Sequence, residues 1–386
     1  AMARRKRNEG LIRRRANGLY EVRVTDPASG KRVSIYSKDE DDAVRELGKA
    51  REAIEDGLGL GDARLTLGAY LGTWLQGVKP TVRPTTYKRY EQLVRLQIVP
   101  RAGNLRVKSL TPVHLRALYS KLQTEPRARR KKDSAPLAPR TVGHVHRVLH
   151  AALEQAARDG LIARNVASLV SPPKVPYEEM AILTPEQVKR LIATVKGDRH
   201  EAMIVLAVTS GMRLGELLGL RWADVDLDEP AVRVVRSLAP VDGKLVYQEP
   251  KTSRSRRTVT LTQTAVVSLK EHRKRQAAEE LAAVGWIRND LVFPTPIGMP
   301  QHPATFGAEW RILRDRAGLP ATFRFHDLRH TCASLALAGN VPVPDVSAML
   351  GHANPAITLS IYSHALPGSL KNAADAMDRI LEAAGA

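Results

Sequence analysis

The chain has 386 residues, and its 60 Lys and Arg against 40 Asp and Glu give a formal net charge of +20. A chain of this length is expected to fold as two or three domains rather than around one core. No apolar run reaches the roughly 18 residues that a membrane-spanning helix needs, and no apolar stretch follows the basic N-terminus as in a secretory signal. The single cysteine, Cys332, excludes an internal disulfide and a cysteine-based zinc site.

The positive charge is concentrated in one part of the chain. Residues 63–176 hold 21 Lys and Arg against 5 Asp and Glu, whereas residues 1–62 hold 14 against 12 and residues 177–386 hold 25 against 23. A solubilising surface needs only a modest, mixed charge. The middle segment therefore predicts a domain that binds a polyanion, with nucleic acid favoured over a merely solvated surface.

Residues 1–62 predict a small α+β module of three strands and one helix. Strand-like runs at 10–15, 18–25 and 31–37 are separated by the turn sequences "ANG" and "DPASG", and residues 38–57 have helical character with acids in the first turn. A basic sheet can enter the major groove of DNA, so we expect a DNA-binding module, with a solvated basic tail as the alternative. The candidate DNA-binding residues lie on the tail and the first strands: Arg4, Arg5, Lys6, Arg7, Arg13, Arg14, Arg15 and Arg23.

Residues 63–172 predict an all-α domain. Helical patterns run over 66–78, 83–103, 111–123 and 138–162, and a basic loop separates the last two. The segment contains no Phe, so duplex backbone contact is favoured over a platform that stacks single strands. The histidines of the last helix have no acidic or cysteine companions, so no metal site is predicted there. Polar helix positions carry the candidate DNA-binding residues Lys88, Arg89, Arg95, Arg140 and Arg147.

After a Pro-rich linker at 171–179, residues 173–386 predict a mixed α+β, mainly helical domain with four separated features. Arg213 precedes Glu216 by three residues at the start of a helix, and Lys251 falls at a hairpin tip. His326 and Arg329 share one face of a later helix, whereas the adjacent His330 is expected to point elsewhere. His352 is followed ten residues later by Tyr362. Each feature alone also fits a structural role, such as a surface ion pair or a packed tyrosine.

In this order and spacing, the set resembles the tyrosine recombinases, also called phage-type integrases. Their pattern is an "RxxE" helix, a lysine on a β-hairpin, a "HxLRH" box, an "LGH" box and a tyrosine nine or ten residues later. This sequence carries each part. The resemblance is strong over 180–386, extends to 64–170 in charge and helical character, and is loosest over the first sixty residues, which resemble an arm-binding module. It implies the catalytic residues Arg213, Lys251, His326, Arg329, His352 and Tyr362, with Glu216 in a supporting role.

The resemblance implies cleavage of DNA through a covalent 3′-phosphotyrosine that leaves a free 5′-hydroxyl. Tyr362 is the expected nucleophile, His326 its base and Lys251 the acid, while Arg213, Arg329 and His352 stabilise the phosphate. No acidic cluster suited to Mg²⁺ stands among these motifs and no nucleotide-binding loop is visible, so neither cofactor, metal nor ATP is predicted. The alternatives are a chromosome-dimer resolvase, a type IB topoisomerase and a non-enzymatic DNA-binding regulator.

The expected partner is double-stranded DNA at core and arm-type attachment sites, bound by a homotetramer in the bacterial cytoplasm at the nucleoid. An accessory protein, either an excision factor or a host DNA-bending protein, is a further expected partner. The last residues form an apolar stripe on a short helix that needs a covering surface. Docking on its own domain and docking on a neighbouring protomer both remain open for this stripe, which consists of Leu370, Ala373, Ala374, Met377, Ile380 and Leu381.

Overall fold

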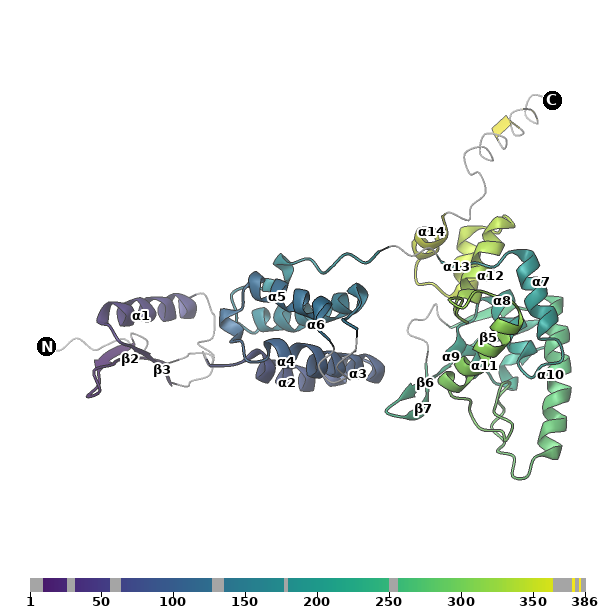
Figure 1. Ribbon diagram of the computed structural model, residues 1–386, viewed down its shortest axis with the longest axis horizontal. Coiled ribbons are helices and arrows are strands. Elements are labelled where there is room, and N and C mark those ends of the chain that lie inside the picture. Colours follow the sequence, from purple (N-terminus) through teal and green to yellow (C-terminus); the bar gives the residue numbers. More distant parts are fainter. Residues whose placement is uncertain are drawn as a thin grey trace. The chain divides into compact units, whose positions relative to one another are not determined.

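The structure is a computed structural model that describes residues 10–25, 32–55, 64–126, 135–176, 180–249, 256–363, 377–378 and 382. Contacts divide the chain into two compact units, Ala1–Tyr177 and Glu178–Ala386 (Figure 1). The predicted multidomain organisation with a mainly helical last domain is confirmed, while the predicted boundary between 62 and 63 stays a prediction. Within the described residues, no helix combines the length and the apolar character needed to cross a membrane.

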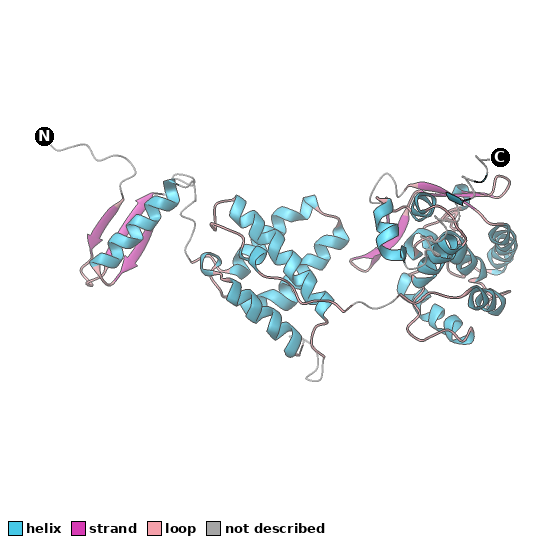
Figure 2. Ribbon diagram, turned by 90° about the horizontal axis from the view of Figure 1, so that it is seen from above, coloured by secondary structure: helices cyan, strands magenta, loops and turns pink. Residues whose placement is uncertain are grey.

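The first described elements are three antiparallel strands and one helix. The strands β1 (Leu11–Arg14), β2 (Tyr20–Thr25) and β3 (Arg32–Ser37) pair in the order β1-β2-β3, and α1 (Glu40–Glu55) follows. Figure 2 shows α1 lying along the sheet. Side chains alternate between the two faces of the sheet. Val22 and Val24 are buried with Ala43 and Ala50 of α1, whereas Arg23, between the two valines, lies on the opposite face.

A helical bundle occupies the rest of the first unit. It consists of α2 (Leu67–Val78), α3 (Pro84–Leu93), α4 (Val99–Ala102), α5 (Pro112–Thr124) and α6 (Pro139–Arg158), with short 3-10 turns between them. The predicted helical segment at 83–103 contains a π-helical turn at Val94–Ile98, which ends two residues before Pro100, a residue that has no N–H to donate. Thr66 and Thr111 cap α2 and α5 by accepting hydrogen bonds from backbone amides three residues on.

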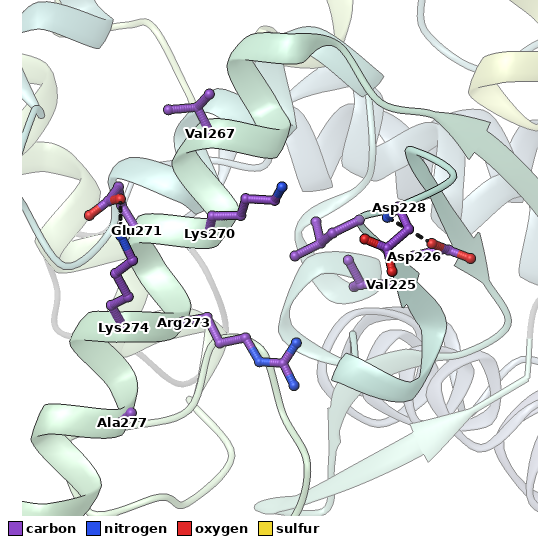
Figure 3. A pocket seen from close by; sticks show the side chains of 10 residues that line it. Val225, Asp226, Asp228, Val267, Lys270, Glu271, Arg273, Lys274 and Ala277 are labelled. Atoms are coloured by element: carbon purple, nitrogen blue, oxygen red, sulfur yellow. Dashed lines mark hydrogen bonds and ion pairs between the residues drawn. The ribbon is translucent and has the colours of Figure 1, made fainter.

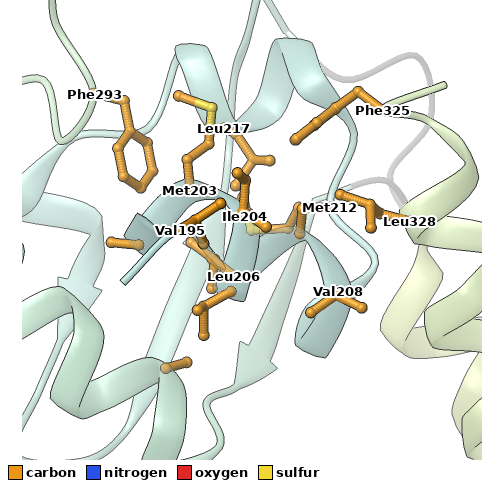
Figure 4. Packing of buried hydrophobic residues seen from close by; sticks show 14 of the residues in the cluster. Val195, Met203, Ile204, Leu206, Val208, Met212, Leu217, Phe293, Phe325 and Leu328 are labelled. Carbon is orange, nitrogen blue, oxygen red and sulfur yellow. The ribbon is translucent and has the colours of Figure 1, made fainter. Parts of the chain in front are cut away.

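The second unit is built around one buried helix. It begins with α7 (Pro185–Thr194), and then α8 (Glu201–Ser210) is buried over almost its whole length, with Met203, Ile204 and Leu206 inside the core shown in Figure 4. A short helix α9 (Leu214–Leu218) follows. Strands β4 (Val225–Asp226), β5 (Ala231–Val234) and β8 (Arg257–Thr260) form one antiparallel sheet, and β6 (Ser237–Val241) pairs with β7 (Lys244–Gln248) in a hairpin.

The remaining helices close the second unit. They are α10 (Gln263–Ala282), α11 (Pro303–Arg316), α12 (Asp327–Ala338), α13 (Val343–Leu350) and α14 (Pro355–Tyr362). A small separate core joins the last three of these, and it contains Ala333, Leu337, Val346, Leu350 and Tyr362. Helices α13 and α14 therefore pack back onto the helix that begins at the "HDLRH" box. Of the predicted tail stripe, only Met377 lies among the described residues, and it is exposed.

Candidate active site

Arg213 stands where the chain leaves the buried helix α8. Gly211 ends that helix with a φ of +63°, and a Cβ there would lie 2.5 Å from Cδ2 of Leu350, so both the backbone and the close packing require glycine. Arg213 then begins α9, where Glu216 accepts hydrogen bonds from its backbone N (2.9 Å) and its Nη1 (2.8 Å). The side chain of Arg213 remains 39% exposed, so its other donors can reach a bound phosphate.

Arg329 is the second arginine of the site, and it is almost fully buried. It is 3% exposed, and its Nη1 and Nη2 donate to the carbonyl oxygens of Gly211 (2.6 Å) and Leu350 (2.8 Å). Burial, followed by the nearby charge of Arg213, lowers its pKa to about 10, which still leaves it charged at neutral pH. Arg329 thereby joins the end of α8 to the end of α13 and adds a fixed positive charge between them.

His352 follows directly after α13. The helix ends at Gly351, whose φ of +67° is the left-handed conformation that glycine adopts freely. His352 Nδ1 lies 2.8 Å from the hydroxyl of buried Thr358, and this contact fixes the ring. Burial and then the charges of Arg329 and Arg213 lower the pKa of His352 to about 4, so the free protein holds it neutral.

Tyr362 is held inside the protein by a histidine that the sequence reasoning did not assign. The tyrosine is 1% exposed, and its hydroxyl lies 2.7 Å from Nδ1 of His330. Burial is the largest influence on its pKa and outweighs the opposing charge of Arg329, so the pKa rises to about 12. Burial also lowers the pKa of His330. The free protein therefore stores a protonated phenol beside a neutral imidazole.

The expectation that His330 points elsewhere is wrong. His330 lies four residues after His326, and residues at that spacing share a helix face; the two rings are 5.2 Å apart between centroids. This four-residue spacing in the sequence could have predicted that His330 lies beside His326. His326 itself begins α12 with a pKa lowered to about 4 by burial, then by His330 and Arg329. Its role as the base stays a prediction, because the hydrogen bond recorded for the Tyr362 hydroxyl goes to His330.

Most of the predicted catalytic residues lie close enough together for their charges to affect one another. Arg213 influences the pKa of Arg329, His326, His352 and Tyr362, which come from three separate segments of the chain. Lys251 lies outside the described residues, so its acid role also stays a prediction. Arg257 was not predicted, although it contacts Glu216 at this site; one arginine among the basic residues of "TSRSRR" carries no signal of its own.

On the N-terminal sheet, basic residues gather around one buried carboxylate. Glu21 accepts hydrogen bonds from Arg15 Nε (3.0 Å), Arg23 Nη2 (3.1 Å) and Ser34 Oγ (2.9 Å). Burial alone would raise its pKa, but the hydrogen bonds from these three residues lower it to about 2. Arg13 lies directly opposite Glu21 on the neighbouring strand. Arg14 instead lies over the ring of Tyr20, and the predicted tail residues Arg4, Arg5, Lys6 and Arg7 are outside the described residues.

In the helical bundle, three predicted DNA-binding arginines surround one histidine. His144 Nδ1 lies 2.8 Å from Nη2 of Arg147. Burial is the first cause of its lowered pKa, followed by the charges of Arg147, Arg89 and Arg140. Arg89 belongs to α3 and the other two to α6, so the fold unites residues that are 51 positions apart in sequence. Lys88 is partly buried, and Arg95 forms an ion pair with Glu91 at 3.6 Å.

A pocket of 790 Å³ lies elsewhere in the second unit, between β4 and α10 (Figure 3). Asp226 and Asp228 line one side, and Lys270, Glu271 and Arg273 line the other. None of the predicted catalytic residues that the structure describes lines this pocket. Within the described part of the chain, no group of three or more His, Cys, Asp or Glu side chains is arranged to hold a metal ion.

Comparison with known proteins identifies the family to which the chain is similar. Residues 181–368 match the Phage integrase family, and residues 66–123 match the N-terminal SAM-like domain of phage integrases. A "Tyrosine recombinase XerC-like" of Caldanaerobacter subterraneus subsp. tengcongensis is 29% identical over 384 residues, covering 93% of this chain and 95% of the relative. An "Integrase" of Streptomyces ambofaciens is 27% identical over 398 residues and covers 98% of each chain.

The fold is also found in a solved structure. The Tn1549 transposon integrase, determined in complex with a circular intermediate DNA, aligns with a TM-score of 0.69 at 20% identity, covering 81% of this chain and 99% of that one. By its two matched domains and its ordered motifs, the chain belongs to the phage integrase family of tyrosine recombinases.

Proposed function

We propose that this chain acts as a site-specific DNA recombinase in which Tyr362 attacks a DNA phosphodiester to integrate or excise a mobile element. The observation that carries the proposal is the meeting of Tyr362 with Arg329, Arg213 and His352 at one site, in the order typical of the family. A phosphodiester resists nucleophiles because it is negatively charged, and its transition state concentrates more charge on the equatorial oxygens. Cations fixed in advance stabilise that charge.

Attack by Tyr362 forms a bond between its oxygen and the phosphorus, and it breaks the bond to the 5′ oxygen of the next nucleotide. The phenol loses a proton to a base, which we assign to His326, and the departing 5′ oxygen gains one, which we assign to Lys251. The 3′-phosphotyrosine retains the energy of the broken bond. A 5′-hydroxyl from another duplex can then reverse the reaction and join strands without ATP.

Because Tyr362 is buried in the free protein, its hydroxyl must become accessible before it can attack DNA. A buried phenol with a pKa near 12 is protonated at neutral pH, and its hydroxyl is bonded to His330 rather than open to DNA. We propose that binding of the attachment site moves α14 so that the hydroxyl leaves His330. The free enzyme would then have little capacity to cut DNA away from its site.

A DNA duplex that carries a nick near the cleavage position tests this function directly. Cleavage releases a short fragment with its 5′-hydroxyl, so the covalent complex is trapped and survives denaturant. We expect a denaturant-resistant adduct with the wild-type chain, an unchanged yield after EDTA is added, and no adduct with Tyr362→Phe, which retains the packed ring and still binds DNA. A normal adduct yield from Tyr362→Phe would exclude this nucleophile, and no wild-type adduct on any attachment site would favour a DNA-binding regulator.

Joining between two duplexes separates the remaining alternatives. A type IB topoisomerase relaxes one duplex, whereas a recombinase transfers a strand to a second one. A chromosome-dimer resolvase also joins two duplexes, but it resembles this chain without its first sixty residues. The sheet module with Arg13, Arg15 and Arg23 therefore favours an integrase that also binds arm-type sites.

We propose that two separate domains of the chain bind DNA. The basic helical domain, with Arg89, Arg140 and Arg147 around His144, binds the backbone of the core site, and the N-terminal sheet binds the arm site. Exchange between two duplexes involves two cleavages on each, which a homotetramer supplies. We place this assembly at the nucleoid in the bacterial cytoplasm because its substrate is chromosomal, together with an excision factor or a host DNA-bending protein.

A further inference from the structure

Arg257 is a buried arginine at the centre of the candidate active site that the proposed chemistry does not use. It is the first residue of β8 and lies opposite Val234 of β5. Its side chain is only 6% exposed. Nη1 and Nη2 donate to the two carboxylate oxygens of Glu216, at 3.3 and 3.0 Å, and Nε donates to the carbonyl oxygen of Met349 at 2.6 Å. Every nitrogen of its guanidinium thus has an acceptor inside the protein.

Glu216 is shared between two arginines. Besides the fork from Arg257, its carboxylate accepts hydrogen bonds from the backbone N and the Nη1 of Arg213. Without Arg257, Arg213 and Glu216 would form a pair with no net charge, and the pull of Arg213 on a phosphate would be largely cancelled. With Arg257 present, the three groups carry one net positive charge, and the half-exposed guanidinium of Arg213 is the part of the group that DNA can reach.

Arg257 also holds the segment that carries His352. Two consecutive carbonyl groups at the end of α13 are each bound by a buried arginine: Met349 by Arg257, and Leu350 by Arg329. Gly351 follows, and a Cβ at this position would lie 3.0 Å from Nη1 of Arg257. The turn into His352 is therefore shaped against the side chain of Arg257.

We propose that Arg257 is a positioning residue of the cleavage reaction. It is the counter-ion that neutralises Glu216, which leaves the charge of Arg213 free for the scissile phosphate, and it fixes the turn that presents His352. It does not touch the DNA itself. The proposal rests on the function described above and assigns a third arginine to the same site.

Two substitutions separate the charge of Arg257 from its geometry. Arg257→Met keeps the length of the side chain without charge or donors, and Arg257→Lys keeps the charge without the fork. At saturating nicked DNA and pH 7, we expect single-turnover cleavage by Arg257→Met to fall about 100-fold. Arg257→Lys is expected to recover part of that loss. Half-site binding should stay within about threefold of wild type for both, because the basic helical domain supplies most phosphate contacts.

Arg314 provides a matched control for a merely structural effect. It is a buried arginine of the same unit that also combines one carboxylate, that of Asp315, with one backbone carbonyl, that of Ala321, and it contacts none of the proposed catalytic residues. Arg314→Met is expected to lower the melting temperature, although by less than Arg257→Met because Asp315 is exposed and Glu216 is buried, while cleaving within about threefold of wild type. If the two variants lost cleavage equally, the role of Arg257 would be structural and the proposal would be overturned.

The pH profile of Arg257→Met, compared with that of the destabilised control Arg314→Met, separates an effect on charge from loss of stability. The charged groups that face Glu216 are Arg213 at its own helix start, Arg257 from β8 and Arg329 from α12. Burial raises the pKa of Glu216, but Arg257 and then Arg213 lower it by more, so the net shift is downward. Removing Arg257 should raise this pKa, and the acidic fall in cleavage rate should then begin at a higher pH in Arg257→Met than in wild type.

A double-substitution cycle completes the test. In a Glu216→Gln background the carboxylate charge is absent, so Arg257 has nothing to neutralise, and Arg257→Met should cost less than about tenfold there. Full additivity of the two substitutions, or wild-type cleavage by Arg257→Met with an unmoved pH profile, would overturn the proposal. If the wild-type chain itself gave no Tyr362-dependent adduct, the proposed function would fail instead, so the two failures are distinguishable.

Discussion

Single side chains decide the proposed chemistry, and the two arginines that we propose to face the phosphate differ in how they are held. Arg213 is half-exposed and paired with Glu216, whereas Arg329 is buried and bonded to two carbonyl groups. Loss of one fixed donor to transition-state charge typically costs about 3–4 kcal/mol. Arg213→Ala and Arg329→Ala should therefore each slow adduct formation by roughly 10²–10³-fold at saturating DNA.

Stability should separate these two variants further. Arg329→Ala leaves the carbonyl groups of Gly211 and Leu350 without their donor inside the core, so it should also lower the free energy of unfolding by about 1–3 kcal/mol. Arg213→Ala should leave unfolding by urea nearly unchanged. Cleavage by either variant within tenfold of wild type would contradict their role at the phosphate.

Three histidines with a lowered pKa predict how stability depends on pH. The folded protein holds the pKa of His272, His326 and His352 at about 4, against a usual value of 6.5, because desolvation disfavours the charged imidazole. The unfolded chain therefore takes up protons at a higher pH than the folded one, so this contribution to stability is complete above about pH 6.5 and is lost as the pH falls towards 4. The melting temperature of the free protein should fall steadily as the pH is lowered from about 6.5 to about 4.

His326→Asn is the variant that checks this assignment. It removes one of the three groups, so the melting temperature should depend less steeply on pH between 6.5 and 4 than it does in wild type. An unchanged slope would mean that His326 takes up its proton at the same pH in the folded and unfolded chains.

At the scale of elements, the turn after α13 transmits local geometry to the site. Gly351 has a positive φ and packs against Arg257, so Gly351→Ala should combine backbone strain of about 1–2 kcal/mol with displacement of that arginine. Gly197→Ala is the matched control, because Gly197 has a φ of +79° but no atom lies within 4 Å of the added Cβ. Both variants should lose stability in urea, but only Gly351→Ala should also slow cleavage markedly.

The sequence was sufficient to predict these elements where periodicity and caps agree. Thr111 and Thr184, each three residues before a backbone amide that it caps, locate the starts of α5 and α7, and the apolar stripe of α6 locates the core of the bundle. The catalytic motifs were recognisable because their spacing in sequence is distinctive. The π-helical turn at Val94–Ile98 was not predictable, because one proline inside a helical pattern is also compatible with a kink or a helix end.

The contacts among the motifs depended on tertiary structure. Nothing in the sequence pairs Arg257 with Glu216 across 41 residues, or Tyr362 with His330 across 32. The pairing of His326 with His330 was the exception, because helical spacing alone places their rings together. Burial of Tyr362 was likewise unpredictable, since a tyrosine after an "LGH" box is equally compatible with an exposed nucleophile.

At the scale of the whole molecule, the first sixty residues should be separable from the cutting reaction. The N-terminal sheet has a core of its own, formed by Val22, Val24, Ala43 and Ala50. Deleting residues 1–60 should leave cleavage of a core site intact and should weaken recombination between full-length attachment sites. The point variant Arg13→Ala/Arg14→Ala should reproduce this loss with the module still folded, because both side chains are exposed and the partners of Glu21 are kept, as measured by product formation on paired DNA substrates. Normal recombination by both would remove the arm-binding role.

The burial of Tyr362 has a consequence for how the protein ages. Oxidants and nitrating agents attack phenol rings that meet solvent, and Tyr36 and Tyr247 do so. Tyr362 does not, since its ring fills the small core between α12 and α14 and its hydroxyl is occupied by His330. Surface tyrosines can therefore be modified while Tyr362, the proposed nucleophile, stays protected in the free protein.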